Sequence, residues 1–183
     1  MKVELTDIDG VFLIRPDVYR DHRGFFMETY SYNKYSEYGV TNTFIQDNHS
    51  HSVINTFRGL HYQLKNPQGK LVRVLKGAVI DIVLDIRLNS PTFGKCITFD
   101  LDDKDFLQIY LPPGMAHGFY VKSEFTDFEY KCTNYYFPED QNGVSYKDTS
   151  LHLDFIPQNA IISDQDESFL SLNSIPESLL PKF

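Results

Sequence analysis

Hydrophobic and polar residues alternate over many short stretches of this chain, and a period of two is typical of β-strands. The clearest run extends over residues 70–87 and is interrupted at Lys76 and Gly77, where a tight turn fits. In its second half, isoleucine or leucine occupies alternate positions, and the face between them carries Asp81, Asp85 and Arg87. We therefore expect two consecutive strands, the second with a polar face that meets water or a ligand instead of a dry core.

Further strand-like runs occur over residues 11–14, 24–30, 96–101, 106–111, 118–122 and 128–136. Prolines separate several of them, as expected because proline cannot donate a hydrogen bond to a sheet ladder. Helical signals are confined to residues 33–38, ended by Gly39, and to residues 163–170. Many short strands at regular spacing predict an all-β fold, a sandwich or barrel with a few short helices.

The chain shows no internal repeat, low-complexity tract or interdomain linker, and its 183 residues suit one domain. Hydrophobic residues make up 42% and charged residues 23%, a composition typical of a globular protein. We expect a single domain over residues 1–183, with a short helical tail at about 163–183.

The charge balance limits the classes of partner. Seventeen basic side chains against 25 acidic ones give a net charge of −8, whereas nucleic-acid-binding proteins present a basic surface. The N-terminus lacks the apolar segment of a signal peptide, and no stretch reaches the ~20 apolar residues of a membrane span. We expect a cytosolic protein that binds neither nucleic acid nor membrane, with Cys96 and Cys132 as reduced, buried thiols.

Arg58, His61 and Lys70 bring a guanidinium, an imidazole and an ammonium into one short segment before a predicted strand. An imidazole both takes and gives a proton near neutrality, because its ordinary pKa is about 6.5. An ammonium can hold the negative charge of a deprotonated carbon acid, and a guanidinium binds phosphate in a bidentate manner. The combination predicts proton abstraction next to a carbonyl on a phosphate-bearing substrate, although a lone strand histidine is more often structural and Lys70 could be a strand-edge charge.

The segment Pro112-Pro113-Gly114-Met115-Ala116-His117-Gly118 contains the proline, glycine and histidine of the second cupin motif. Cupins are double-sheet jelly-roll barrels, and many hold a metal with a carboxylate and two histidines one residue apart. His61 has no such partner, and His49 and His51 have the spacing but lie in residues 46–52, whose polar composition favours a loop. We expect a cupin-like barrel with no metal and no cofactor, its cavity open to an organic substrate.

Several collinear blocks resemble one known family. They are DHRGFFME at 21–28, QDNHS at 46–50, RGLHYQ at 58–63, QGKLVRV at 68–74, GMAHGF at 114–119 and YKCTNYY at 130–136. Over residues 11–170, approximately, the chain resembles the dTDP-4-dehydrorhamnose 3,5-epimerases. These are cupin-like enzymes that invert two carbons of a nucleotide-linked 4-keto sugar.

The resemblance implies an isomerase of dTDP-rhamnose and polysaccharide biosynthesis that converts dTDP-4-dehydro-6-deoxy-D-glucose to dTDP-4-dehydro-L-rhamnose. The C4 carbonyl acidifies the hydrogens at C3 and C5, so His61 would be the general base that forms an enolate. Tyr130 would return a proton from the opposite face, and Lys70 would stabilise the enolate oxygen. Spacing alone would make Tyr130 a core residue, so its assignment depends on its family position.

The resemblance also implies a buried carboxylate that orients His61 and raises its basicity, and the matching position is Asp166. Ser163 and Asp166 equally fit a capping box at a helix start, which needs no catalysis. Asp164 is a close neighbour that could take the same role, so both alternatives stay open.

Substrate contacts implied by the resemblance are Arg23, Phe26, Glu28, Gln46, Asn48, Arg58 and His117. Arg23 and Arg58 would hold the diphosphate. In the family, the segment that carries Arg23, Phe26 and Glu28 reaches into the neighbouring subunit's site. We therefore expect a homodimer whose sites are completed in trans and whose partner molecule is a nucleotide-diphosphate sugar.

The family gives Asp81 and Asp85 no settled chemistry, and we interpret both as structural. We expect the remaining histidines on the surface or in loops: His22, His49, His51 and His152.

Three local departures from the family leave the exact sugar open: residues 55–57, a tyrosine at Tyr146 where tryptophan is usual, and residues 173–183. Relatives of this fold act on other nucleotide-linked keto sugars, and some invert one carbon only. The alternatives are a single-centre C3 or C5 epimerase on a related dTDP- or GDP-linked 4-keto sugar, a non-catalytic sugar-nucleotide binder, and an iron-dependent cupin dioxygenase.

Overall fold

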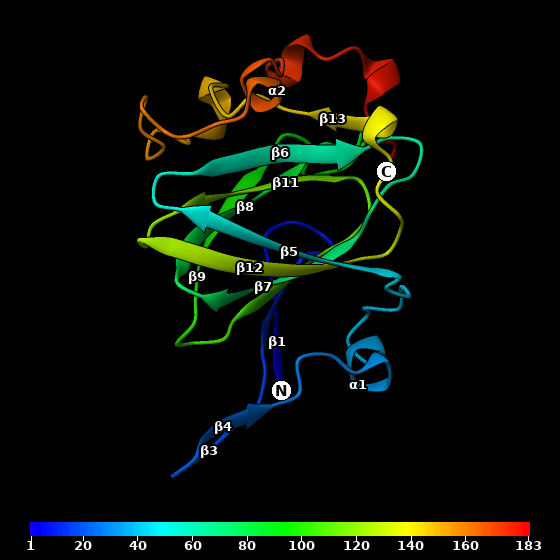
Figure 1. The fold of residues 1–183 in the computed structure, drawn as a ribbon. Coiled ribbons are helices and arrows are strands. Elements are labelled where there is room, and N and C mark those ends of the chain that lie inside the picture. Colours follow the sequence, from blue (N-terminus) through cyan, green and yellow to red (C-terminus); the bar gives the residue numbers. More distant parts are fainter.

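Two antiparallel β-sheets face each other in the computed structural model, which describes all residues 1–183 (Figure 1). One sheet has six strands in the order β1 (Lys2–Leu5), β2 (Phe12–Arg15), β10 (Gln108–Leu111), β7 (Lys70–Lys76), β12 (Phe125–Cys132) and β5 (Gln46–Val53). The other has five, in the order β13 (Gln141–Gly143), β6 (Phe57–Gln63), β11 (Met115–Val121), β8 (Ala78–Asp85) and β9 (Cys96–Asp102). This is the expected all-β, cupin-like architecture.

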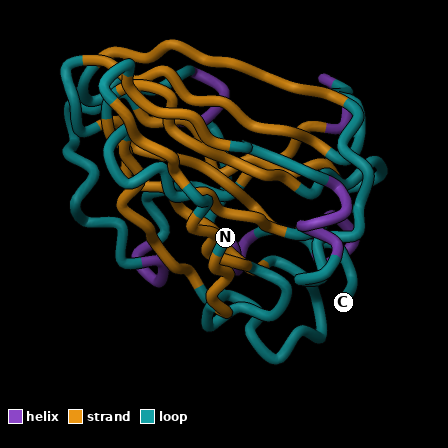
Figure 2. The backbone as a smooth tube through the Cα atoms, turned by 90° about the horizontal axis from the view of Figure 1, so that it is seen from below, coloured by secondary structure: helices purple, strands orange, loops and turns teal.

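A separate two-stranded hairpin, β3 (Val18–Asp21) and β4 (Gly24–Met27), extends away from the sheets near the N-terminus (Figure 1). Helices are few and short: α1 (Tyr32–Ser36), α2 (Asp164–Glu167) and four 3-10 turns at Pro138–Asp140, Thr149–Leu151, Leu172–Ser174 and Glu177–Leu179. The strands cross the molecule side by side, and loops join their ends (Figure 2). None of the helices has the length and apolar character needed to cross a membrane.

Apolar side chains form three clusters in layers. The first lies between the two sheets, where the rings of Phe119 and Phe128 stack with centroids 4.4 Å apart. A second lies between the isoleucine and leucine face of β8 and the C-terminal segment. A third packs Tyr35 and Val40 from the α1 region onto Leu71 of the six-stranded sheet. The sheets are thus covered on both outer sides by flanking segments, while the cavity of the molecule opens between them.

The hydrophobic alternation located most strands correctly. β7 and β8 meet at Gly77 as expected, and β2, β9 and β10 coincide with predicted runs to within two residues at each end. β11 and β12 begin three residues before the predicted starts at 118 and 128, so His117 lies on a strand and not in the turn before it.

The prediction of a loop at residues 46–52 is wrong, because this segment is β5, paired with β12 over eight positions. Gln46, Asn48 and Ser50 face the cavity between the sheets, whereas His49 and His51 are exposed on the other face. One face of β5 is exposed to solvent and the other lines the cavity, so polar residues occupy both faces. The strand therefore lacks the alternation of apolar and polar residues by which strands are identified in a sequence.

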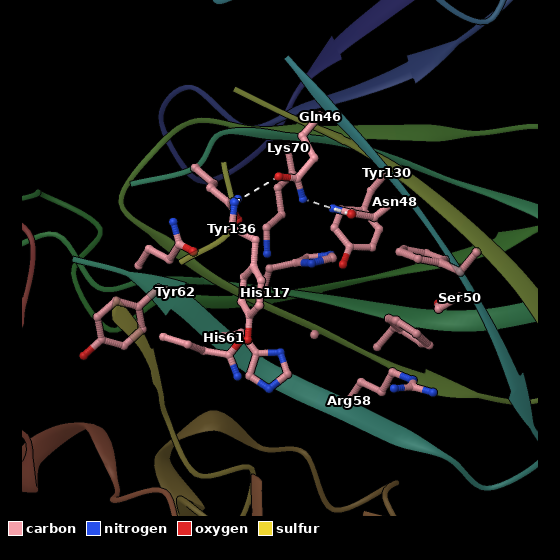
Figure 3. Close-up of a pocket in the computed structure, with 16 residues that line it drawn as sticks. Gln46, Asn48, Ser50, Arg58, His61, Tyr62, Lys70, His117, Tyr130 and Tyr136 are labelled. Carbon is pink, nitrogen blue, oxygen red and sulfur yellow. Dashed lines mark hydrogen bonds between the residues drawn. The ribbon is translucent and has the colours of Figure 1, made fainter. Parts of the chain in front are cut away.

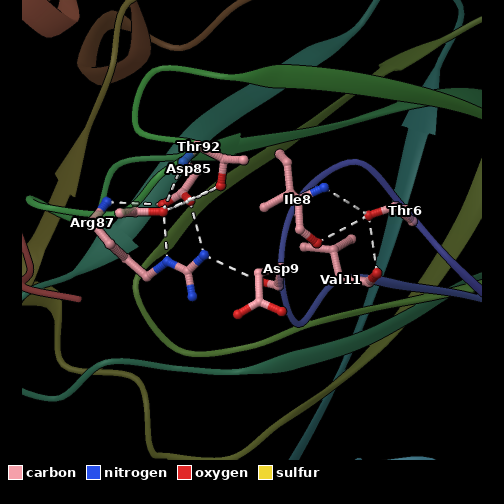
Figure 4. A network of polar contacts seen from close by, with 8 residues as sticks. Thr6, Ile8, Asp9, Val11, Asp85, Arg87 and Thr92 are labelled. Carbon is pink, nitrogen blue, oxygen red and sulfur yellow. Dashed lines mark hydrogen bonds and ion pairs between the residues drawn. The ribbon is translucent and has the colours of Figure 1, made fainter.

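The polar face of β8 was expected to meet water or a ligand, and its burial excludes water. Asp81 and Asp85 are 0% exposed and Arg87 only 8%. Asp85 accepts hydrogen bonds from Arg87 Nε at 2.9 Å, Ser90 Oγ at 2.6 Å and Thr92 Oγ1 at 2.7 Å. Arg87 also donates to the carbonyl of Asp9 at 3.2 Å, which fixes the N-terminal loop against the sheet (Figure 4). Asp85 is therefore structural, as interpreted.

Candidate active site

A cavity of about 260 Å³ lies between the sheets, and side chains from both of them line it (Figure 3). It brings together seven residues that the sequence analysis selected: Gln46, Asn48, Arg58, His61, Lys70, His117 and Tyr130. These residues come from five strands and are separated by up to 84 positions in the sequence. The fold thus brings these seven side chains to one cavity.

Strand register explains how they meet. In the six-stranded sheet, Tyr130 is opposite Asn48, and Lys70 is opposite Cys132, two residues beyond Tyr130. In the five-stranded sheet, His61 of β6 is directly opposite His117 of β11. Because residues two apart in a strand point to the same face, each sheet presents a row of polar side chains to the cavity.

His61 is held by a carboxylate from the C-terminal segment. Its Nε2 lies 2.7 Å from Oδ1 of Asp166, and the two side chains are 28% and 5% exposed. Since an ionised carboxylate only accepts hydrogen bonds, Nε2 carries the hydrogen and Nδ1 is left with a lone pair. The ring projects into the cavity from β6 (Figure 3). The imidazole is thus arranged to accept a proton there.

Asp166 makes the contact with His61, and it makes only the backbone half of a capping box with Ser163. Its backbone N–H donates to Ser163 Oγ at 3.1 Å, so Ser163 caps α2. Its carboxylate instead bonds His61 and accepts the backbone N–H of Gly59 at 3.0 Å. Burial alone would raise the pKa of Asp166, but these hydrogen bonds and the adjacent imidazole outweigh burial and hold the pKa below its usual value. Asp164 is exposed and makes no contact with His61, which excludes it from this pair.

Gly59 allows β6 to approach β11 closely. A Cβ at Gly59 would lie 2.6 Å from the Cα of Gly118, and its φ of 139° falls in a region that side chains disfavour. The same glycine turns its N–H toward Asp166. The RGLH segment therefore needs its glycine for strand packing, and the backbone N–H of the same residue binds the carboxylate.

Tyr130 and Lys70 lie on the six-stranded sheet, across the cavity from His61. Burial raises the pKa of Tyr130 to about 12, so the phenol keeps its proton at neutral pH. Burial also lowers the pKa of Lys70. The Lys70 ammonium lies 5.6 Å from the centre of the Tyr130 ring. A phenol and an amine thus share one wall of the cavity.

A second histidine–carboxylate pair was not predicted. Nε2 of His117 lies 2.8 Å from Oδ2 of Asp81, and the side chains are 6% and 0% exposed. Asp81 Oδ1 is buried without a hydrogen-bond partner. Asp81 of β8 therefore orients His117, which lines the cavity. In the sequence, the only indication was the position of Asp81 on the polar face of β8.

The nucleotide-binding candidates are organised by their own hydrogen bonds. Gln46 donates to Asn48 Oδ1 at 3.0 Å and accepts the backbone N–H of Tyr136 at 2.9 Å (Figure 3). Arg58 donates from Nε to Ser52 Oγ at 3.0 Å, and its side chain is otherwise exposed at the cavity. The side-chain amides of Gln46 and Asn48 are thus fixed in position and can form hydrogen bonds with a polar ligand, and the Arg58 guanidinium is available to bind an anion.

Arg23, Phe26 and Glu28 do not line the cavity of their own chain. They lie on or directly after the β3–β4 hairpin, where Arg23 pairs with Asp21 at 2.6 Å and Glu28 with Lys34 at 2.9 Å. Phe26 is 71% exposed. Within one chain, these three residues form a separate surface.

Several lining residues escaped the sequence analysis: Ser50, Tyr62, Gln63, Gln68, Tyr136 and Gln141. All of these except Gln141 lie within the sequence blocks that resemble the family, and membership in a block was the available signal. Gln141 lies on β13, a three-residue strand with no hydrophobic pattern. In the cavity, no three side chains of His, Cys, Asp or Glu type converge as metal ligands would.

Comparison with known proteins places these features in a family context. The family model described as dTDP-4-dehydrorhamnose 3,5-epimerase matches residues 5–174. The dTDP-4-dehydrorhamnose 3,5-epimerase of Methanothermobacter thermautotrophicus is 40% identical over 174 residues, which cover 93% of this chain and 94% of the relative.

Solved structures agree. A dTDP-6-deoxy-D-glucose-3,5-epimerase from Legionella pneumophila Philadelphia 1, in complex with dTDP-4-keto-L-rhamnose, superposes with a TM-score of 0.96 at 43% identity, covering 100% of this chain and 98% of the other. A 3′-monoepimerase from Streptomyces bikiniensis, in complex with dTDP-quinovose, has a TM-score of 0.89 at 27% identity, with coverage of 97% and 91%.

Proposed function

The chain belongs to the dTDP-4-dehydrorhamnose 3,5-epimerase family and is an epimerase; we propose that it inverts both C3 and C5 of dTDP-4-dehydro-6-deoxy-D-glucose to give dTDP-4-dehydro-L-rhamnose. The observation that supports this most directly is the His61–Asp166 pair on one side of a cavity whose other side carries Tyr130 and Lys70. This is the set of groups that stepwise inversion next to a carbonyl requires: a base, an acid on the opposite face and a cation for the intermediate.

In the proposed mechanism, Nδ1 of His61 takes the proton from C3 or C5. The electron pair of the broken C–H bond moves into the C4 carbonyl and forms an enolate. Lys70 stabilises the charge on the enolate oxygen, and Asp166 stabilises the imidazolium through Nε2. The Tyr130 hydroxyl then gives its proton to the carbon from the opposite face, which inverts the centre. One inversion leaves His61 protonated and Tyr130 ionised, and exchange with water restores both groups.

The diphosphate would be bound by Arg58 and by Arg23 of a second subunit, with Glu28 and Phe26 completing the nucleotide site in trans. The position of the β3–β4 hairpin supports this, because it extends from the sheets and leaves Phe26 71% exposed (Figure 1). Gln46, Asn48 and His117 would supply the contacts from the chain that holds His61. We propose a homodimer in which residues 1–183 form one epimerase domain per subunit, located in the cytosol.

The experiment is to incubate the purified protein with dTDP-4-dehydro-6-deoxy-D-glucose in D2O and to follow C3 and C5 by NMR. Deuterium at both carbons, with an L-configured product trapped by a reductase, is the expected result. His61→Asn should abolish exchange, whereas the matched substitution of the exposed His152, His152→Asn, should leave it unchanged. Full exchange in His61→Asn would show that the assignment of the base is wrong.

A second candidate is a single-centre epimerase, and the likeness to the 3′-monoepimerase from Streptomyces bikiniensis is the observation that favours it. The same experiment separates the two candidates, because this one predicts deuterium and inversion at one carbon only. No exchange at either carbon would exclude this substrate and direct the assay to GDP-linked keto sugars.

A further inference from the structure

Phe169 contacts the proposed base without lining the cavity. Its ring meets the His61 imidazole edge to face, with centroids 5.8 Å apart and planes at 81°. Phe169 is half-buried, and it does not belong to the residues around the cavity. It follows Asp166 by three residues, so one segment supplies both the carboxylate on Nε2 and the ring against the imidazole.

The ring of Phe169 occupies a space that a glycine leaves open. Gly143 of β13 is paired with His61 of β6. A Cβ on Gly143 would lie 2.2 to 2.5 Å from three ring carbons of Phe169, far closer than atoms approach. The φ of Gly143 is outside the left-handed range, so its backbone conformation does not require glycine. The phenyl ring is what excludes a side chain at this position.

The backbone on the C-terminal side of Phe169 is anchored. Ser145 donates its backbone N–H to the carbonyl of Leu170 at 2.9 Å, and Leu172 donates to Oδ2 of Asp148 at 2.8 Å. On the N-terminal side, Asp166 is fixed by Ser163 and Gly59. The ring position is therefore set by the segment as a whole, independently of the imidazole.

We propose that Phe169, seated on Gly143, is a positioning residue that holds the His61 imidazole in its proton-accepting orientation. The hydrogen bond to Asp166 fixes one ring atom, and the imidazole can still turn about that atom. A second contact on the ring restricts this rotation, so Nδ1 stays directed at the substrate carbon. Reaction rates depend steeply on such placement, because displacement by about 1 Å can cost about 100-fold. This inference rests on the proposed role of His61 as base.

The first test is Phe169→Ala, measured by deuterium exchange at C3 and C5. We expect kcat to fall about 10- to 100-fold, while KM changes less than about twofold because Phe169 does not touch the cavity. Phe169→Leu should recover part of the loss, since it restores bulk beside the imidazole. Leu170→Ala, a neighbouring substitution of a side chain that is 54% exposed, is the matched control and should behave as wild type.

The decisive test is a double-mutant cycle with Gly143→Ala. In the wild-type background, the new methyl group must displace the Phe169 ring, so Gly143→Ala should lower kcat as Phe169→Ala does. In the Phe169→Ala background, the space is empty, and Gly143→Ala should cost nothing further. Equal losses in both backgrounds, or Phe169→Ala with wild-type kcat, would overturn the proposal.

Imidazole NMR supplies a readout besides activity. In wild type, Nε2–H of His61 should give a slowly exchanging signal, because it is bonded to a buried carboxylate. Phe169→Ala should broaden or lose this signal while the thermal unfolding transition stays cooperative. If wild type exchanged deuterium at neither carbon, the proposed function would fail. The Nε2–H signal would still test the positioning role separately: its loss in Phe169→Ala would support that role, and an unchanged signal would contradict it.

Discussion

Tyr130 and His61 share one cavity but lie in different surroundings. Burial raises the pKa of Tyr130 to about 12, so its hydroxyl is a donor at neutral pH. His61 has a carboxylate on Nε2, and its Nδ1 has no hydrogen-bond partner in the chain. Two groups with different environments can thus serve as acid and base at a single pH.

Tyr130→Phe tests this division of labour. Removing the hydroxyl leaves His61 and Lys70 in place, so hydrogens at C3 and C5 should still exchange with D2O through the enolate. Inversion should fall by about 100-fold or more, because no group delivers a proton from the opposite face. NMR measures the exchange, and a coupled reductase measures the L-configured product.

The matched control is Tyr135→Phe, which removes a hydroxyl from a side chain that is 56% exposed and outside the cavity. This variant should form the L-configured product at the wild-type rate. A wild-type rate for Tyr130→Phe would show that another group is the acid.

The strand β8 ends in a buried charge network that holds the N-terminal loop. Asp85 is fully buried and accepts hydrogen bonds from Arg87 and Thr92 (Figure 4). It also accepts one from Ser90. Burial alone would raise the pKa of Asp85, but the hydrogen bonds from these three residues outweigh it and lower the pKa. The network therefore depends on an ionised carboxylate.

Asp85→Asn should destabilise the protein by about 3–5 kcal/mol, because it removes one partner of a buried ion pair. Urea unfolding at pH 7 measures the loss. Asp100→Asn, on the neighbouring strand, is the control: its side chain is 78% exposed in an ion pair with Lys122, so its effect should stay below about 1 kcal/mol. Equal losses in the two variants would contradict the role given to Asp85.

The pH dependence of stability follows from the same pKa. The folded pKa of Asp85 lies below its unfolded value of about 3.9, so its contribution is complete above that value and is lost as pH falls through the folded pKa. Stability of wild type should therefore decrease below about pH 4 more steeply than that of Asp85→Asn. Parallel acid profiles for the two proteins would show that Asp85 does not titrate in this way.

The chain as a whole leaves its β3–β4 hairpin uncovered. Tyr19, Phe25 and Phe26 are 64%, 54% and 71% exposed, although apolar side chains of this size gain free energy from burial. A second subunit that receives the hairpin would bury them and obtain Arg23 at its cavity. Because the net charge is −8, the proposed anionic substrate would have to be attracted locally, and Arg58 and this second arginine would supply that attraction.

Subunit mixing tests completion of the site in trans. His61→Asn and Arg23→Ala should each be nearly inactive alone. In a mixed dimer, one site would combine an intact His61 with an intact Arg23, and the other would lack both. Random reassortment should restore about a quarter of wild-type activity, since about half of the dimers are mixed and each has one intact site.

Mixing His61→Asn with Tyr130→Phe is the matched control, because both residues line the cavity of the same chain and cannot complement each other. If mixing His61→Asn with Arg23→Ala gave no more activity than the two variants have separately, Arg23 would not belong to the site of the partner subunit.

By itself, the sequence determined the all-β class and most strands, and it selected seven residues that line one cavity. Alternation over residues 70–87 specified β7 and β8, because a sheet with one apolar face must repeat every two residues. The collinear blocks around His61, Lys70 and Tyr130 identified the family, and the comparisons confirm that the chain belongs to it. Local chemistry and local period were sufficient for these conclusions.

Only the tertiary structure decided which polar residues meet. It selected Asp166 over Asp164, paired Asp81 with His117, identified β5 as a strand and placed Phe169 on Gly143 beside the imidazole. Each of these depends on contacts between segments distant in the sequence, whose partners no local pattern can specify. A polar residue facing a cavity and one facing water look alike in the chain, and the packing of the two sheets is what distinguishes them.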